Sequence, residues 1–245
     1  MATAQPPRRT REIEYPTSDG KPMAETELHL DDMIDTIQVL RDHFAAASDV
    51  YVCGNLLLYY EEGNPRKHVS PDVLVALGVP KKPLRDYYLV WKEGKAPDFV
   101  AEITSKSTKQ EDMKKKFAIY RDLLRVSEYF LFDPRAEYLN PPLQGFRLVG
   151  GEYVGIEPVA GRLPSEVLGL HLERDGEKLR LFDPSTGRRL LTPIEGREVA
   201  EHRAEVERRR AEVERRRAEA AEVVQVRLAE ENERLRREIE TLRGG

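Results

Sequence analysis

The chain has 245 residues, 40% of them hydrophobic and 34% charged, so it can bury one sizeable core and still leave much of its length in solvent. Its formal net charge of -4 argues against a protein that coats nucleic acid through bulk electrostatics, so any phosphate contact must come from a local patch. A single cysteine, Cys53, excludes an internal disulfide and multi-cysteine zinc sites, which favours a reducing compartment.

Residues 1–24 are polar and contain several prolines, a composition typical of a flexible segment. They lack the apolar stretch of a signal peptide, and no later segment approaches the roughly 20 apolar residues that span a bilayer. We therefore expect a cytoplasmic protein without a membrane anchor.

Helix and strand signals alternate through residues 25–193. Apolar residues recur at helical spacing between Thr26 and Ala47, which predicts one amphipathic helix. A second helix is predicted after Thr108, ending near Leu124. Strand-forming residues are concentrated in the runs 51–53, 56–60, 73–77, 99–103 and 128–132.

Residues 137–192 carry paired strand signals around the turns Gly150-Gly151 and Asp175-Gly176. We interpret them as a β-rich extension of the same domain. Residues 25–193 are thus predicted to form one α/β (α+β) domain.

From about Ile194 onward the composition changes abruptly, because Glu, Arg and Ala dominate and there is no further proline. The repeat AEVERRR occurs twice in tandem and places Val206 and Val213 seven residues apart, the heptad spacing of a coiled coil. We predict that residues 194–245 form a coiled coil that joins two or more copies of the chain; a dimer is the expected assembly, although the pattern does not fix two, three or four strands.

The sevenfold spacing continues at Leu228, Leu235 and Leu242. Asn232 falls four residues after a leucine, the companion seam position of a heptad, so it is a candidate register-setting residue. Because the heptads shift between the valine and leucine blocks, the pattern leaves open whether one coil runs through both.

Two acidic residues are candidates for a catalytic site. Asp72 opens one predicted strand, and Glu102 interrupts the apolar run of another, where a partly buried acid requires a partner or a metal. Carboxylates that converge at one end of a sheet suit Mg²⁺ or Mn²⁺. For Asp72 alone, however, a proline-aspartate pair is more often a strand or turn start.

Other residues support this site less directly. Lys116, on the following helix, is the cation we select to accompany the two acids, although a lysine run is commonly only a solvated helix face. Tyr120 lies one turn further on that face and either assists or simply packs. Asp98 shares a strand face with Glu102, so it either ligates a metal or merely begins the strand.

Three stretches resemble the Uma-type family of bacterial proteins: SPDVLVALGVP, VWKEGKAPDFVAEITSKST and EDMKKKFAIYRDLLRVSEYFLFDP. The similarity runs from about Asp49 to Pro193. It implies a restriction-endonuclease-like core of the PD-(D/E)XK superfamily, with a central mixed sheet flanked by helices. Asn55, in the stretch GNLLLYYEEGNPRK, also matches a family motif, but we assign it no chemical role.

The resemblance implies that Asp72 and Glu102 are the two acidic residues of the superfamily motif and that the Ile103 carbonyl is a further metal contact. Thr104 stands where the superfamily has a lysine. In Uma-type proteins that role moves to a D-x-x-x-K-x-x-x-Y pattern, matched here by Asp112, Lys116 and Tyr120.

The leading hypothesis is therefore an Mg²⁺- or Mn²⁺-dependent endonuclease acting on DNA. A second is a catalytically inactive nuclease fold that binds DNA or acts as a scaffold, and a third makes the coil the main functional element. A basic loop, containing Lys81, Lys82, Arg85, Lys92 and Lys95, either follows a phosphate backbone or is an ordinary soluble loop.

Overall fold

The computed structural model describes residues 13–18, 20, 26–105, 108 and 110–243. The chain divides into two compact units, with the boundary after Pro193. Each unit is described by itself. Of the segment 1–24, which we predict to be flexible, residues 13–18 and 20 are described and the others lie outside the described residues.

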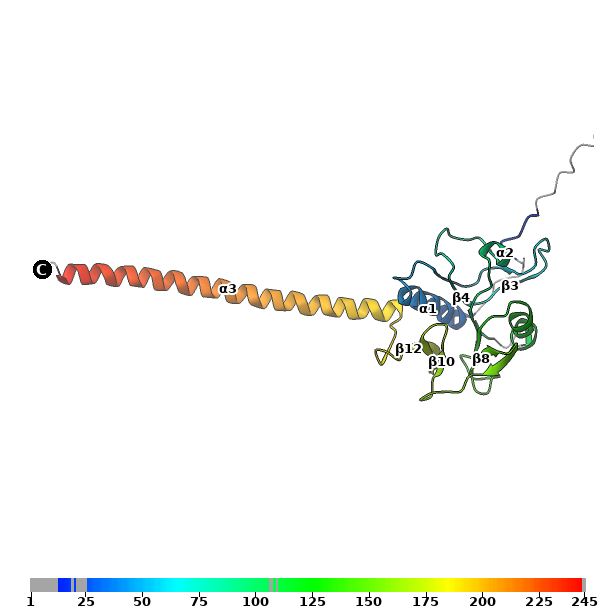
Figure 1. The fold of residues 1–245 in the computed structure, drawn as a ribbon. Coiled ribbons are helices and arrows are strands. Elements are labelled where there is room, and N and C mark those ends of the chain that lie inside the picture. The colour runs from blue at the N-terminus through cyan, green and yellow to red at the C-terminus, as the bar shows by residue number, and fades with distance from the viewer. Residues whose placement is uncertain (1–12, 19, 21–25, 106–107, 109, 244–245) are drawn as a thin grey trace, which may run out of the picture. The chain divides into compact units, whose positions relative to one another are not determined.

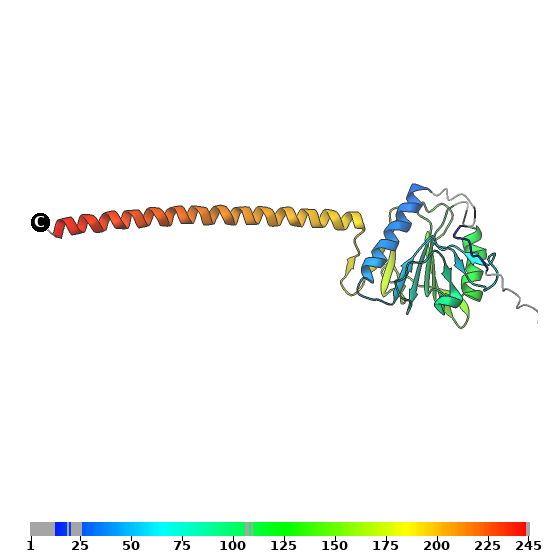
Figure 2. The ribbon, with the colours of Figure 1, turned by 90° about the horizontal axis from the view of Figure 1, so that it is seen from above.

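A six-stranded mixed sheet forms the centre of the first unit (Figures 1 and 2). Only β6 and β7 run parallel, and the other neighbours are antiparallel. In spatial order the strands are β1 (Val50–Cys53), β4 (Val73–Leu77), β6 (Phe99–Ile103), β7 (Glu128–Phe132), β8 (Leu143–Val149) and β9 (Glu152–Gly155).

Strands β6 and β7 are buried along their whole length, because the sheet is covered on both faces. Strands buried on both sides appear as nearly continuous apolar runs, as these do apart from Glu102 and Glu128. The mixed sheet with flanking helices confirms the predicted α/β fold class.

One face of the sheet is covered by α1 (Glu27–His43), which begins at the N-cap Thr26. Its buried residues Met33, Val39 and Leu40 join a core cluster that also contains residues of the four-stranded sheet. That smaller sheet consists of β10 (Leu163–Ser165), β11 (Leu170–Asp175), β12 (Lys178–Asp183) and β13 (Arg188–Arg189). The predicted β-rich extension is therefore confirmed.

The opposite face carries the second predicted helix, seen on the other side of the strands from α1 in Figure 2. Most of it has the wider π-helical turn, in the segments η1 (Glu111–Lys116) and η2 (Ile119–Leu123). The Phe117 N–H, for example, donates to the Asp112 carbonyl five residues earlier. Such π-helical turns are rare and frequently occur at functional sites.

A three-stranded sheet of very short strands completes this unit. Its members are β2 (Leu58–Tyr59), β3 (His68–Val69) and β5 (Tyr88–Leu89), and the four-residue helix α2 (Val90–Glu93) follows directly. Only two residues of the predicted strand 56–60 pair. Tyr15 packs edge-on against Tyr59, so this part of the segment expected to be flexible is anchored to the domain.

The second unit is a single helix, α3 (Pro193–Arg243), whose described side chains are almost all exposed. Among the residues that the structure describes, no helix combines the length and apolar character needed to cross a membrane.

Candidate active site

Asp72 and Glu102 lie side by side because β4 and β6 are antiparallel neighbours, with Val73 opposite Ala101. Asp72 directly precedes β4, and Glu102 is the fourth residue of β6. The Asp72 N–H donates to Oε2 of Glu102 (3.3 Å), and Oδ2 of Asp72 accepts from the Ile103 N–H (2.8 Å). The sheet register therefore brings two residues 30 positions apart to one edge.

Lys116 reaches this pair from the π-helical segment. Its Nζ lies 2.9 Å from Oε2 of Glu102 and 3.1 Å from Oδ1 of Asp112, and it also donates to the Ser70 carbonyl (3.3 Å). The ammonium thus lies between two carboxylates from different elements.

Tyr120 completes the contacts of Glu102. Its hydroxyl is buried and donates to Oε1 of Glu102 (2.7 Å). Both oxygens of Glu102 therefore accept hydrogen bonds inside the protein, which holds the carboxylate in one orientation. Of the two interpretations of Tyr120, the structure shows direct contact with Glu102 in addition to packing.

Burial dominates the electrostatics of this cluster. The side chains of Glu102 and Asp112 are 1% and 2% exposed. Burial raises the pKa of Glu102 well above its usual range, and Lys116 opposes that shift. Burial lowers the pKa of Lys116, but attraction from Glu102, Asp112 and Asp72 outweighs it, so the net shift is upward. The pKa of Asp112 is likewise raised by burial.

Asp98 is not part of this cluster. It precedes β6 at the opposite end of the strand, where its Oδ2 accepts from the Leu77 N–H (2.7 Å) and lies 2.8 Å from Nζ of Lys95. Four strand residues separate it from Glu102, a distance of roughly 13 Å at about 3.3 Å per residue. Of the two roles considered, beginning the strand is the one its contacts support.

Three cations of the basic loop make contacts within the domain. Lys81 donates to carbonyls at the end of α1, and Lys95 donates to the Leu77 carbonyl. Arg85 forms a bidentate ion pair with Glu93 and lies over the ring of Tyr51. These contacts support the interpretation as an ordinary loop, because the charges are already paired at the end of β4 far from Asp72.

Sequence reasoning missed His29. This buried residue of α1 places Nε2 3.4 Å from Oδ1 of Asp72. The available signal was its place on the buried face of the helix, one turn before Met33, but a lone histidine on such a face gives no indication of its partner.

The motif residues Gly54 and Asn55 now have a structural role. Asn55 adopts a positive φ of 50°, and its N–H donates to the Pro71 carbonyl (2.9 Å). A Cβ added at Gly54 would lie 1.9 Å from the Asp72 carbonyl oxygen, so only glycine permits this close approach. Together the two residues hold the backbone that carries Asp72.

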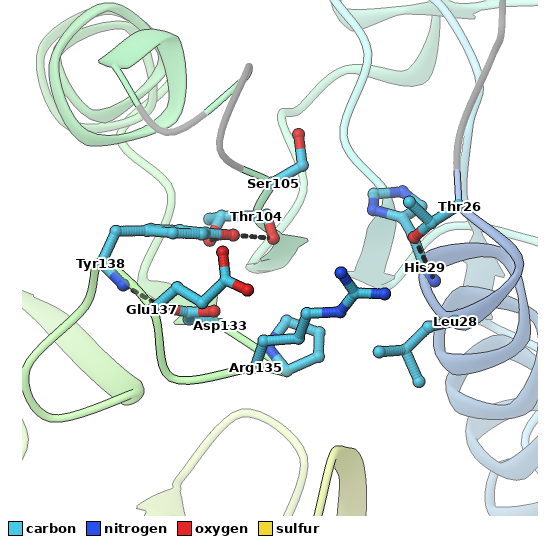
Figure 3. Close-up of a pocket in the computed structure, with 10 residues that line it drawn as sticks. Thr26, Leu28, His29, Thr104, Ser105, Asp133, Arg135, Glu137 and Tyr138 are labelled. Carbon is cyan, nitrogen blue, oxygen red and sulfur yellow. Dashed lines mark hydrogen bonds between the residues drawn. The ribbon is translucent and has the colours of Figure 1, made fainter.

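A cavity of about 470 Å³ adjoins this edge of the sheet (Figure 3). His29 and Thr104 line it, which connects it to Asp72 and to the end of β6. The Thr104 hydroxyl donates to the Phe132 carbonyl (3.2 Å), and the Tyr138 hydroxyl donates to the Thr104 carbonyl. Exposed Arg135 lines the same cavity.

The donor chemistry at Asp72 and Glu102 fits a hard divalent cation, because both are carboxylates and three acids here face a single lysine. Within residues 13–18, 20, 26–105, 108 and 110–243, no group of three or more His, Cys, Asp or Glu side chains is arranged to hold a metal. Two carboxylates are nevertheless a common protein contribution for Mg²⁺, which usually keeps several waters. The Ile103 N–H donates to Asp72, and the predicted contact between the Ile103 carbonyl and a metal stays a prediction.

One of the comparisons with known proteins shows the family of the chain. No curated protein matches the chain. A crystal structure described as "a putative nuclease belonging to DUF820 from Anabaena variabilis ATCC 29413" is 18% identical and superposes with a TM-score of 0.46, over 64% of this chain and 85% of that one. The family model Uma2, described as "Putative restriction endonuclease", matches residues 4–183. Since that match spans well over half of the 245 residues, the chain belongs to the Uma2 family.

Proposed function

We propose that the first unit is a metal-dependent endonuclease that hydrolyses phosphodiester bonds of DNA. The observation that carries the proposal is the convergence of Asp72, Glu102 and Lys116 from three separate elements on one buried polar cluster. Family membership supports the same reaction class.

Asp72 and Glu102 are the residues that would hold Mg²⁺ or Mn²⁺, with the Ile103 carbonyl as a further contact. When bound, such an ion supplies charge neutralisation at the phosphate and lowers the pKa of water. Each acid keeps its orientation through its own partners, Asp72 through the Ile103 N–H and Glu102 through the Tyr120 hydroxyl. This arrangement fixes the ligands before substrate arrives.

Lys116 serves as the cation that faces the phosphate. Its long stem brings the ammonium into the cluster, and Asp112 orients it from one helical turn away. An ammonium held in a partly buried site stabilises negative charge that develops on phosphate oxygens more effectively than one in bulk water. Tyr120 and Asp112 are thus positioning residues for Glu102 and Lys116.

DNA contacts would arise beside the site, since three of the five cations of the basic loop already make contacts within the domain. Arg135 is exposed and lines the cavity next to His29 and Thr104, so it is the local cation best placed to meet a neighbouring phosphate. A net charge of -4 makes such a local contact necessary.

A plasmid-cleavage assay with Mg²⁺ and Mn²⁺ tests the proposal. Glu102→Gln and Lys116→Ala are expected to lose at least 100-fold in rate, the scale typical of one electrostatic catalytic group. Asp98→Asn is the matched control: it removes an ion-paired carboxylate at the opposite end of the same strand, away from the cluster, and should keep the parent rate. Equal cutting by all variants would end the site assignment.

Calorimetric titration with Mg²⁺ separates the enzyme from an inactive scaffold. Binding that disappears in Asp72→Ala supports the nuclease. A chain that binds DNA but shows neither metal binding nor cleavage would instead be a catalytically inactive module.

We also propose that α3 joins two copies of the chain. A deletion of residues 195–245 separates this role from catalysis. A self-sufficient nuclease unit keeps metal-dependent nicking without the helix, whereas complete loss of cutting would make the helix part of the catalytic machinery.

A further inference from the structure

Helix α3 presents a row of aliphatic residues along one side, all of them exposed except half-buried Val206. At about 100° per residue, all of them fall within an arc of about 80°. They define the apolar stripe, which consists of Val199, Val206, Val213, Val224, Leu228, Leu235 and Ile239. Leu228 and Leu235 are 53% and 45% exposed, an unusual state for leucine in a helix.

The stripe stays on one side despite the shift between the two heptad blocks. Val213 and Val224 are eleven residues apart, close to three helical turns, so the step preserves the face. The two halves differ in composition. Arg210 and Arg217 share the arc in the first half, whereas from Val224 onward the arc is aliphatic apart from Glu231 at its border. The second half is therefore the stronger pairing surface.

Ion pairs within the helix contribute little to its stability. Arg209 bonds Glu205, and Arg216 bonds Glu212, all exposed pairs four residues apart. Such exposed pairs stabilise a helix far less than a packed apolar face does. A single helix of 51 residues with this stripe calls for a partner of matching shape.

We propose that this partner is a second copy of the chain, aligned parallel and in register; the inference rests on the dimer proposed above and specifies its geometry. Because both helices then start at Pro193, the two nuclease units join the coil at the same end. Two sites on one assembly would be available for the two strands of a duplex.

Charges beside the stripe suit a parallel pair, and the unequal composition of its two halves favours that direction. In a parallel, in-register pair, a flanking residue of one helix faces the residue five positions further along the other. Glu231 then faces Arg236 of the second copy, and Arg209 faces Glu214 of the second copy, so both contacts are attractive. An antiparallel pair along the whole helix would instead set the aliphatic second half of each copy against the first half of the other, whose arc holds Arg210 and Arg217, so it would bury less apolar surface.

Asn232 fixes how the two helices align along their length. It lies on the seam between Leu228 and Leu235, so in the parallel pair it meets Asn232 of the second copy and the two amides bond each other. Opposite a leucine, either amide would be buried without a partner. Ile239 at the same kind of seam position, with leucines at the other, favours two strands over three or four.

Sedimentation of the full chain provides the first test, and the expected mass is twice 28.1 kDa. The second uses Cys53→Ser/Leu235→Cys in a thiol-disulfide redox buffer. In a pair that overlaps along the whole of α3, the two residues 235 face each other only when the helices are parallel and in register, so this variant should form a covalent dimer. A monomeric chain, a higher oligomer, or a dimer that fails to cross-link would overturn the proposal.

Charge exchange provides the third test. Glu231→Arg should weaken dimerisation roughly tenfold, because it turns two attractive contacts into repulsive ones, and Glu231→Arg/Arg236→Glu should restore it. Glu230→Arg makes the same charge change on the outer side of the helix and should leave the dimer intact. Equal effects at both positions would contradict the assigned flank. None of these measurements reads DNA cleavage, so failure here is distinct from failure of the nuclease proposal.

Discussion

Replacing Gly54 by alanine should displace Asp72 without touching its side chain. The added Cβ would lie 1.9 Å from the Asp72 carbonyl oxygen and 2.6 Å from Cδ1 of Ile37. Contacts under 3.0 Å essentially never occur for a real Cβ, so the backbone must retreat by at least 1.1 Å, the difference between those two distances. Asp72 is backbone-linked to that carbonyl and moves with it.

Two effects of Gly54→Ala follow from this displacement. Overpacking should lower the free energy of unfolding by about 1–3 kcal/mol. Moving Asp72, the proposed metal ligand, by about 1 Å should lower the cleavage rate roughly 100-fold, because its bonds to Glu102 and Ile103 would lengthen beyond hydrogen-bonding range.

Urea unfolding measures the first effect, and plasmid cleavage at matched folded protein concentration measures the second. Gly155→Ala is the control, since a Cβ there meets nothing within 4 Å and should leave both quantities near the parent values. A Gly54→Ala protein with the parent unfolding midpoint and the parent cleavage rate would refute this account of the site.

Three further predictions concern buried charge and the coil. Lys116→Met should lower the free energy of unfolding by about 3–5 kcal/mol at neutral pH, because Glu102 keeps no cation; a chemical denaturation loss below about 1 kcal/mol would contradict the buried ion pair. Burial raises the pKa of Asp32 to about 6. Since the raised value favours the protonated form, its stabilising contribution is complete below about pH 4 and is lost as the pH rises through 6. The free energy of unfolding of Asp32→Asn should therefore rise by about 3 kcal/mol relative to that of the parent when the pH is raised from 4 to 8, because each unit of the pKa shift is worth roughly 1.4 kcal/mol. A difference between the two proteins that does not depend on pH would contradict the assigned shift. Asn232→Leu should yield mixed oligomers of higher stability by sedimentation, and a uniform dimer would show that Asn232 sets no register.

The predicted positions of Asp72, Glu102 and Lys116 came from local signals that tertiary structure preserves. Glu102 interrupts an apolar run, and such an interruption in a buried strand demands a partner wherever the strand lies. Asp98 shows the limit of the same reasoning. Even spacing places Asp98 on the same strand face as Glu102, but the two residues lie at opposite ends of β6. Asp98 instead accepts a hydrogen bond from Lys95.

The family match to residues 4–183 confirms the resemblance seen in the motifs. The motifs could not indicate which residues hold the backbone at Asp72 in place. Gly54 and Asn55 precede Asp72 by many residues, and only the antiparallel pairing of β1 with β4 brings the two segments together. His29 likewise reaches Asp72 only because α1 packs across the sheet.

The sequence by itself determined the alternation of helices and strands, the change of character near Pro193 and the acids suited to a metal, because periodicity, composition and residue chemistry act locally. Only the tertiary structure decided which charged side chains form ion pairs or hydrogen bonds elsewhere in the domain and which of them meet at one edge of the sheet. Those outcomes depend on strand register and helix docking, which set distances between residues that the chain order keeps far apart.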